Sequence, residues 1–237
     1  MRVTDDEAFI RAIVSAPGDD APRLVYADWL DERGDRRGAY LREETVWARD
    51  RSPSRWADLT AQAPDLDAVW VARISRPPLG VCDDLALARP GPTLRPSHLE
   101  YVEQRLRLKL PSDLYAFLLD RNGGQPADRR LFIVPDGTIF LQVDRFLSIF
   151  PRGEPPFAAS SLDDLEAVDA AVRSIEGPDL DGYLTIATVE NDEYLLIGHE
   201  GELADRIFLF APHWVARIMP VADSLSAFFR ELQPAVG

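Results

Sequence analysis

The stretch that most strongly determines the fold is residues 183–210, YLTIATVENDEYLLIGHEGELADRIFLF. Three runs rich in apolar, β-branched and aromatic residues, 183–189, 194–198 and 206–210, predict β-strands. The first two runs are separated by a turn, Glu190-Asn191-Asp192. Parallel strands need a crossover of about a dozen residues or more, so strands joined this closely pair antiparallel. The stretch therefore predicts the centre of an antiparallel sheet.

Further strands and helices are predicted on both sides of this centre. Residues 131–134 and 138–143 predict two strands around a Pro-Asp-Gly turn at 135–137. The helical spacing of apolar residues predicts helices over 97–108, 110–121, 161–174 and 222–232. Helices at both ends of a run of hairpin-connected strands predict the α+β class, with a mostly antiparallel sheet flanked by helices.

The first 76 residues predict helices and no strand. Helices are expected on either side of a break at Pro17-Gly18, and then over 38–48, 56–63 and 66–74. Thr4 and Glu7 have the spacing of a capping box, and so do Ser97 and Glu100. Prolines are dense between residues 77 and 96 and disfavour regular structure there. The sequence predicts a helical module at 1–76, a proline-rich linker at 77–96 and a second domain at 97–233.

The net charge of the chain limits the classes of partner. It has 26 Lys and Arg residues against 40 Asp and Glu residues, a formal net charge of −14. Residues 154–205 hold 14 acidic residues and one basic residue, Arg173. Binding to nucleic acid or to an anionic membrane is disfavoured, because both need cations on the protein. Two interpretations stay open: a docking surface for a basic protein, or a solvated acidic face that keeps the chain in solution.

The composition predicts a cytoplasmic protein with a hydrophobic core. No apolar run approaches the ~18–20 residues of a membrane span. The first residues, MRVTDDE, turn acidic at once and lack the apolar stretch of a signal peptide. A single cysteine, Cys82, cannot form an internal disulfide.

No pattern of residues predicts catalysis, a metal or a cofactor. The sequence has no Gly-x-Ser-x-Gly elbow, and Cys82 has no histidine close to it in the sequence. The run His199-Glu200-Gly201-Glu202 lacks the spacing of a metal site, and residues 179–182 lack most ligand positions of a calcium loop. The run at 199–202 is interpreted as a solvated turn. We expect no catalytic residue, no metal ligand and no cofactor.

The N-terminal helices resemble a known module. Residues 7–35, EAFIRAIVSAPGDDAPRLVYADWLDERGD, resemble the bacterial repeat-companion domain, and the resemblance covers about residues 5–45. This family has no established biochemical role, so the resemblance names the module without explaining it. The charged residues Arg23, Asp28, Asp31 and Arg33 are interpreted as ion pairs between adjacent helices rather than as a site.

The second domain resembles a different family. Residues 110–119, LPSDLYAFLL, followed by Asn122-Gly123-Gly124, resemble the SUKH superfamily, the Smi/Knr-like domain. Later segments, from 183 to 229, resemble in order its central strand, the turn and strand after it, a further strand and the C-terminal helix. The resemblance covers about residues 94–233. The family's turn before the second strand usually contains glycine, and the turn at 190–192 has none, which leaves its geometry open.

The SUKH resemblance implies a non-enzymatic domain that binds other proteins. Bacterial members are similar to immunity proteins that neutralise secreted toxins, often nucleases, and fungal members to regulatory interaction proteins. A nuclease toxin is typically basic because its substrate is anionic, so an acidic surface would bind it quickly and block the substrate site. The expected partner contacts are Asp163, Asp164, Glu190, Asp192 and Glu193, with Trp214 as a candidate exposed anchor.

Three hypotheses remain at this point. The first is an immunity-type module that binds a basic partner, which predicts salt-sensitive binding without turnover. The second is a scaffold protein that binds one partner with each module, mainly through apolar anchors such as Trp214. The third is an unrecognised hydrolase, which would need titratable residues gathered in a cleft.

Overall fold

The structure is a computed structural model that describes residues 4–128, 130–133, 140–151, 164–214 and 218–234. The chain divides into two compact units, Met1–Asp84 and Leu85–Gly237. The stretch interpreted as a linker contributes to both: Val81 and Cys82 are buried in the first unit, whereas Leu87 pairs with Pro126 in the second. The turn expected at 135–137 lies outside the described residues.

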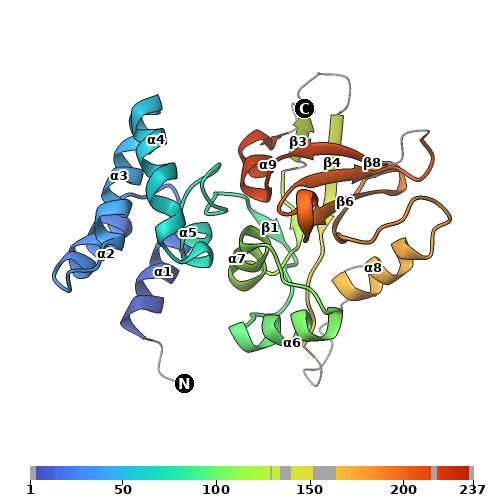
Figure 1. Cartoon of the computed structure of the whole chain (residues 1–237), viewed down its shortest axis with the longest axis horizontal. Coiled ribbons are helices and arrows are strands. Elements are labelled where there is room, and N and C mark those ends of the chain that lie inside the picture. Colours follow the sequence, from blue (N-terminus) through green and yellow to red (C-terminus); the bar gives the residue numbers. More distant parts are fainter. Residues whose placement is uncertain (1–3, 129, 134–139, 152–163, 215–217, 235–237) are drawn as a thin grey trace. The chain divides into compact units, whose positions relative to one another are not determined.

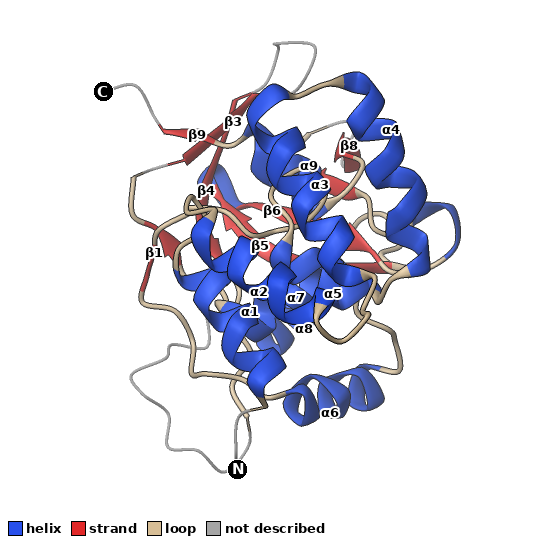
Figure 2. Ribbon diagram, turned by 90° about the vertical axis from the view of Figure 1, so that its left-hand side faces the viewer, coloured by secondary structure: helices blue, strands red, loops and turns tan. Residues whose placement is uncertain are grey.

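The described part of the first unit contains helices and no strand, as the sequence predicts (Figures 1 and 2). Its elements are α1 (Asp5–Ser15), α2 (Ala21–Asp31), α3 (Arg37–Asp50), α4 (Pro53–Gln62), η1 (Ala63–Asp65) and α5 (Ala68–Ile74). Aromatic rings form much of its core, and the hydroxyl of buried Tyr26 accepts a hydrogen bond from Trp70 at 3.2 Å. On the surface Arg42 of α3 pairs with Asp28 and Asp31 of α2, at 2.5 and 2.7 Å. Asp28 and Asp31 thus pair between adjacent helices as expected, but with Arg42, whereas Arg33 pairs with its neighbour Glu32.

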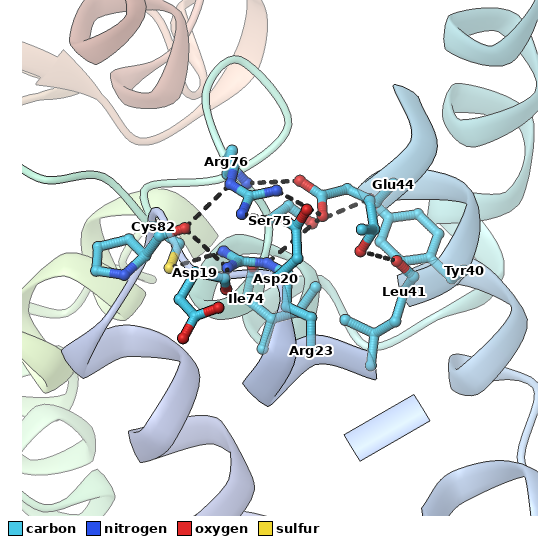
Figure 3. A network of polar contacts seen from close by, with 12 residues as sticks. Asp19, Asp20, Arg23, Tyr40, Leu41, Glu44, Ile74, Ser75, Arg76 and Cys82 are labelled. Atoms are coloured by element: carbon cyan, nitrogen blue, oxygen red, sulfur yellow. Dashed lines mark hydrogen bonds and ion pairs between the residues drawn. The ribbon is translucent and has the colours of Figure 1, made fainter. Parts of the chain in front are cut away.

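A fully buried arginine holds the ends of the first unit together (Figure 3). The guanidinium of Arg23 donates to the backbone carbonyls of Pro17, Asp19 and Ile74 at 2.8, 3.2 and 3.0 Å. It also donates to the thiol of Cys82 at 3.3 Å. One side chain of α2 therefore joins the loop before α2, the end of α5 and the segment after it.

The same arginine faces a buried carboxylate. Glu44 of α3 has a side chain with no exposed surface, and its Oε2 lies 3.6 Å from Arg23 Nε. Its Oε1 accepts a hydrogen bond from the backbone amide of Arg76 at 3.1 Å. Burial raises the pKa of the Glu44 carboxyl, although the positive charges of Arg23 and Arg76 act in the opposite direction.

Of the two expected capping boxes, the one at Thr4 forms in part and the one at Ser97 does not form. Thr4 Oγ1 accepts from the amide of Glu7 at 3.3 Å, but the Glu7 carboxylate pairs with Arg73 at 2.8 Å. The ion pair with Arg73 holds the Glu7 carboxylate, so the second hydrogen bond of the capping box does not form. The box expected at Ser97 is wrong, because the helix begins at Pro96 and Arg95 is its N-cap residue.

The second unit is built on one seven-stranded antiparallel sheet in the order β8-β7-β6-β5-β4-β3-β9 (Figure 1). Its strands are β3 (Arg130–Ile133), β4 (Phe140–Phe146), β5 (Tyr183–Val189), β6 (Glu193–Gly198), β7 (Ile207–Phe210), β8 (Ile218–Ala222) and β9 (Gln233–Pro234). A small separate pair joins β1 (Leu87–Ala88) to β2 (Gln125–Pro126). The α+β class and the antiparallel sheet are confirmed.

Helices flank this sheet. They are α6 (Pro96–Leu106), α7 (Ser112–Asp120), α8 (Leu165–Arg173) and α9 (Leu225–Glu231), with short 3-10 turns η2 (Glu190–Asp192) and η3 (Gly201–Leu203). Rings from α7, β4 and α9 meet in the core, where Phe117 lies 5.2 Å from Phe146 and 5.4 Å from Phe229 between ring centroids. The helix expected to start at residue 222 starts at Leu225, because residue 222 still belongs to β8.

Asn122 ties three loops of the second unit together. Its side-chain amide donates to the carbonyls of Pro92 and Ile149 at 2.8 and 2.9 Å, and its Oδ1 accepts from the amide of Ile149 at 2.7 Å. The residue is buried and adopts a left-handed backbone conformation with φ 49°. Asn122 therefore both ends α7 and holds the loops at Pro92 and Ile149 in place.

Candidate functional site

A pocket of about 810 Å³ lies between α8 and the strands β4, β5 and β6. This volume is in the range of pockets that bind small molecules. Its lining combines a helix face, a charged strand end and a turn: Gln125, Asp144, Arg145, Ala167, Val168, Ala171, Val172, Thr188, Val189, Asn191, Asp192, Glu193 and Tyr194.

The helix α8 supplies the apolar wall of the pocket. Ala167, Val168, Ala171 and Val172 share one face of the helix, since residues three and four apart are neighbours. Polar bonds hold this helix on the sheet: Oδ1 of Asp169 accepts from the amide and the hydroxyl of Thr185, both at 2.9 Å. The position of the wall is thus fixed by contacts outside the pocket.

A β-bulge in β4 supplies the charged floor. Val143 pairs with Val189 and Arg145 pairs with Thr188, which leaves Asp144 as the extra residue of the bulge. In a regular strand, Asp144 and Arg145 would point to opposite faces, whereas here both line the pocket. The strand was predicted to end at residue 143, so this charged pair fell outside it.

The turn η2 closes one end of the pocket. Asn191 and Asp192 have left-handed backbone conformations, with φ 65° and 59°. Asparagine and aspartate tolerate this region better than other non-glycine residues, which explains how a turn without glycine connects β5 to β6. The side chains of Glu190 and Asp192 are exposed, as expected for a projecting turn, and Asp192 lines the pocket.

Glu193 is the unusual member of the site. The sequence suggests a projecting side chain, but the residue is only 7% exposed. The charge of His213 acts on its carboxylate. Burial raises the pKa of Glu193, and the nearby His213 only partly offsets this effect. Groups whose pKa is perturbed in this way are often found at binding sites.

Tyr194 supplies an aromatic ring on the face of the sheet that α8 covers. Its ring is half-buried and stacks on Phe210 with the centroids 6.2 Å apart. Burial raises the pKa of the Tyr194 hydroxyl, and the charge of Asp192 raises it further. The tyrosine is therefore neutral at physiological pH and presents an uncharged face to the pocket.

The other predicted contact residues have different positions. Asp163 lies outside the described residues. Asp164 is the N-cap of α8 and accepts from the amides of Glu166 and Ala167 at 2.9 and 3.3 Å, so its side chain has a structural role. Trp214 is 42% exposed and follows β7, whose last residue Phe210 pairs with Tyr194. Trp214 therefore lies at the same end of the sheet as η2.

The acidic stretch of the sequence is split by the fold. Glu190, Asp192 and Glu193 lie at the end of the β5–β6 hairpin that η2 closes. A second acidic group lies at the opposite end, where Tyr183 pairs with Gly198; it comprises Asp179, Asp181, Glu200, Glu202 and Asp205. The site at η2 thus holds part of the acidic charge and not all of it.

Comparison with known proteins assigns the second unit to a family. The sequence profile of the SMI1 / KNR4 family (SUKH-1) matches residues 93–231, more than half of the chain. The chain belongs to the SUKH-1 family. SUKH domains bind partner proteins and are generally non-enzymatic. The match covers all of α6 to α9 and the pocket of the SUKH domain, and the repeat-companion resemblance of residues 5–45 stays a prediction.

A comparison with the curated proteins finds no match to the chain. No helix in the described parts of the chain is long and apolar enough to cross a membrane. Within the same described ranges, no three His, Cys, Asp or Glu side chains gather closely enough to hold a metal ion.

The sequence analysis missed part of the site. Asp144, Arg145 and Tyr194 line the pocket but were not named as candidates. The available signal was the pair of adjacent opposite charges between two buried residues, Val143 and Phe146. Such a pair in a strand indicates either an edge or a bulge.

Replacing the buried carboxylate by its neutral isostere is expected to stabilise the protein at neutral pH. Since the folded state raises the pKa of Glu193, it binds the proton more tightly than the unfolded chain. The protonated carboxyl therefore stabilises the folded state at low pH, and this contribution is lost as the pH rises through the raised pKa. Glu193→Gln should therefore raise the urea midpoint near pH 7 and leave it almost unchanged near pH 4.

Glu190→Gln is the matched control for this measurement. It makes the same change of charge at the exposed end of the same turn. We expect its urea midpoint to equal that of the parent protein near pH 7 and near pH 4. A lower midpoint for Glu193→Gln at pH 7 would mean that the ionised carboxylate stabilises the fold, contrary to the burial argument.

Proposed function

We propose that the chain is a non-enzymatic protein-interaction protein of the immunity type, which binds and neutralises a basic, nuclease-like toxin in the cytoplasm. The observation that carries this proposal is the acidic end of the SUKH domain, where Glu190 and Asp192 are exposed and Asp192 lines a pocket. We further propose that residues 1–76 and 97–233 act as separate modules joined by the linker at 77–96.

Electrostatic complementarity supports this function. The formal net charge of −14 gives a long-range attraction for a basic partner, which raises the rate of association. A toxin that cleaves nucleic acid presents cations to its anionic substrate. A protein that contacts the same cations competes with the substrate and needs no chemistry of its own.

A scaffold role is the second candidate. It is favoured by the helical first unit, which has a core of its own and resembles a module that precedes diverse domains. In that case each unit would bind a different partner, with Trp214 as an anchor on the second. Removal of residues 1–84 should abolish such a function and leave toxin neutralisation intact.

The test is affinity capture with the full chain from its native lysate at about 50 and about 500 mM salt, on either side of physiological screening. We expect a basic protein that is retained more strongly at low salt. Its nuclease activity should then fall to background as one equivalent of the chain is added. The variant Asp192→Lys should need a larger excess for the same inhibition.

A matched control reverses a charge at the far acidic group. Glu202→Lys makes the same change as Asp192→Lys but at the opposite end of the β5–β6 hairpin. This variant should inhibit the nuclease at nearly the same molar ratio of chain to nuclease as the parent chain. A neutral captured partner that is indifferent to salt, or a basic partner whose activity is unaffected, would contradict toxin neutralisation and favour the scaffold role.

A further inference from the structure

We propose that the chain forms a dimer with a second copy of itself through the outer face of the helices α2 and α3. Dimerisation of this kind is independent of toxin binding by the SUKH domain. Two properties of the face lead to it: it exposes two valines, and the charged side chains around them lie in two rows of opposite sign. A face of this kind is complementary to itself.

The two valines are the most exposed large apolar side chains in the described part of the first unit. Val25 of α2 is 56% exposed and Val46 of α3 is 39% exposed. Valine forms helices less well than glutamate or lysine, so nothing in the helix itself favours it at an exposed position. Exposed apolar residues that share one face of a protein often mark a surface that another protein covers.

Two ion pairs connect α2 to α3, which pack side by side (Figure 1). Arg42 of α3 pairs with Asp28 of α2 at 2.5 Å. Arg49 of α3 pairs with Asp20, the residue before α2, at 2.6 Å. The order of the partners along the chain shows that the two helices are antiparallel. The acidic residues therefore form a row along α2, and the arginines form a parallel row along α3.

The valines lie between these two ion pairs. Val46 is four residues after Arg42 and three before Arg49, so the three side chains share one face of α3. Val25 is three residues before Asp28 and shares its face of α2. The centre of the outer face is thus apolar, and each end of it has an acidic residue beside an arginine.

A two-fold axis that runs between α2 and α3, parallel to both, matches this face with itself. It places α2 of one copy against α3 of the other at the same height. Asp28 then faces Arg42 of the second copy, and each ion pair becomes part of a group of four alternating charges. Val25 faces Val46 of the second copy, so the four valines meet at the centre. An axis across the helices would instead place acidic residues against acidic residues, which is unfavourable.

Other partners fit this face less well. A basic protein would be attracted by the acidic row on α2 but repelled by the arginines on α3. A nucleic acid would be repelled by the acidic row for the same reason. A second copy satisfies both rows at once. The dimer carries two SUKH domains, which strengthens binding to any partner that offers two sites.

Sedimentation equilibrium of the full chain tests the dimer. We expect a reversible change from the mass of one chain to the mass of two between about 1 μM and about 1 mM. Val46→Glu places a charge in the apolar centre and should weaken dimerisation by about ten-fold or more. The matched control is Ala57→Glu, which adds the same charge at an exposed position of α4 and should stay within about two-fold.

Crosslinking tests the orientation of the two copies. Chains with Val25→Cys are mixed with chains with Val46→Cys under mild oxidation, while the native Cys82 is buried and does not compete. The proposed axis brings position 25 of one copy to position 46 of the other. Since a disulfide forms only when the two Cα atoms lie within about 7 Å, crosslinks between unlike positions should form about ten-fold faster than crosslinks between like positions. Circular dichroism of each variant shows that its helices are intact.

The expected masses and crosslinks together support the dimer. A chain that stays monomeric at every concentration, or equal effects of Val46→Glu and Ala57→Glu, would overturn it. Crosslinks mainly between like positions would overturn the proposed axis. A monomeric chain from which Val46→Glu removes the binding of another protein would assign this face to that protein and not to a second copy. None of these outcomes bears on toxin neutralisation, which Asp192→Lys tests separately.

Discussion

Arg23→Met is expected to lower the free energy of unfolding of the first unit by about 3–5 kcal/mol. The variant leaves the Glu44 carboxylate buried without the cation that lies 3.6 Å away. It also removes the donors to the carbonyls of Pro17, Asp19 and Ile74. Urea unfolding followed by tryptophan fluorescence measures the loss, since Trp29, Trp47, Trp56 and Trp70 all lie in this unit.

Two further variants test the cause of this loss. Arg49→Met removes an arginine whose side chain is 65% exposed and which pairs with Asp20, and it should cost less than about 1 kcal/mol. The double variant Arg23→Met with Glu44→Leu removes both buried charges and should recover part of the loss. Equal costs for Arg23→Met and Arg49→Met would show that the buried pair does not stabilise the unit.

The second large effect is expected at Asn122 in the SUKH domain. Asn122→Leu keeps the size of the side chain but removes the donors to Pro92 and Ile149 and the acceptor of the Ile149 amide. These backbone groups are then left without partners, and a branched side chain must adopt φ 49°. We expect a loss of about 3–5 kcal/mol, measured by hydrogen exchange of the β5–β6 amides.

Asn191→Leu separates the two contributions. Asn191 has a similar left-handed backbone, with φ 65°, but its side chain is exposed. Its replacement therefore reports the backbone cost alone, which we expect to be about 1–2 kcal/mol. A loss at Asn122 no larger than the loss at Asn191 would mean that the hydrogen bonds of Asn122 contribute little.

Much of the sheet could be predicted from the sequence because its strands are locally distinct. Residues 183–189 form β5 as expected, since this apolar run has a polar turn on each side. Strand β8 was missed, because residues 218–222, IMPVA, contain a proline and lack alternation. The two-residue strands β1, β2 and β9 are too short to leave a periodic signal.

The candidate site was predicted in part, for a different physical reason. The turn at 190–192 was found because acidic residues interrupt two strands. The pocket depends on the packing of α8 against the sheet, and the bulge at Asp144 depends on the register with β5. Likewise, Arg23 was expected to pair between adjacent helices, but nothing near it in the sequence indicates that its partner is the buried Glu44. Contacts of this kind are fixed by tertiary packing and not by local pattern.

The closure of the first unit by its last residues has a consequence for how such modules can be exchanged between genes. The amide of Val81 donates to the carbonyl of Ala72 at 2.8 Å, and Cys82 binds both Ser75 and Arg23. A recombination breakpoint directly after α5 would remove this closing segment and uncover the buried arginine. Inheritance of the unit with its core intact therefore requires the coding sequence to extend through the cysteine, beyond the last helix.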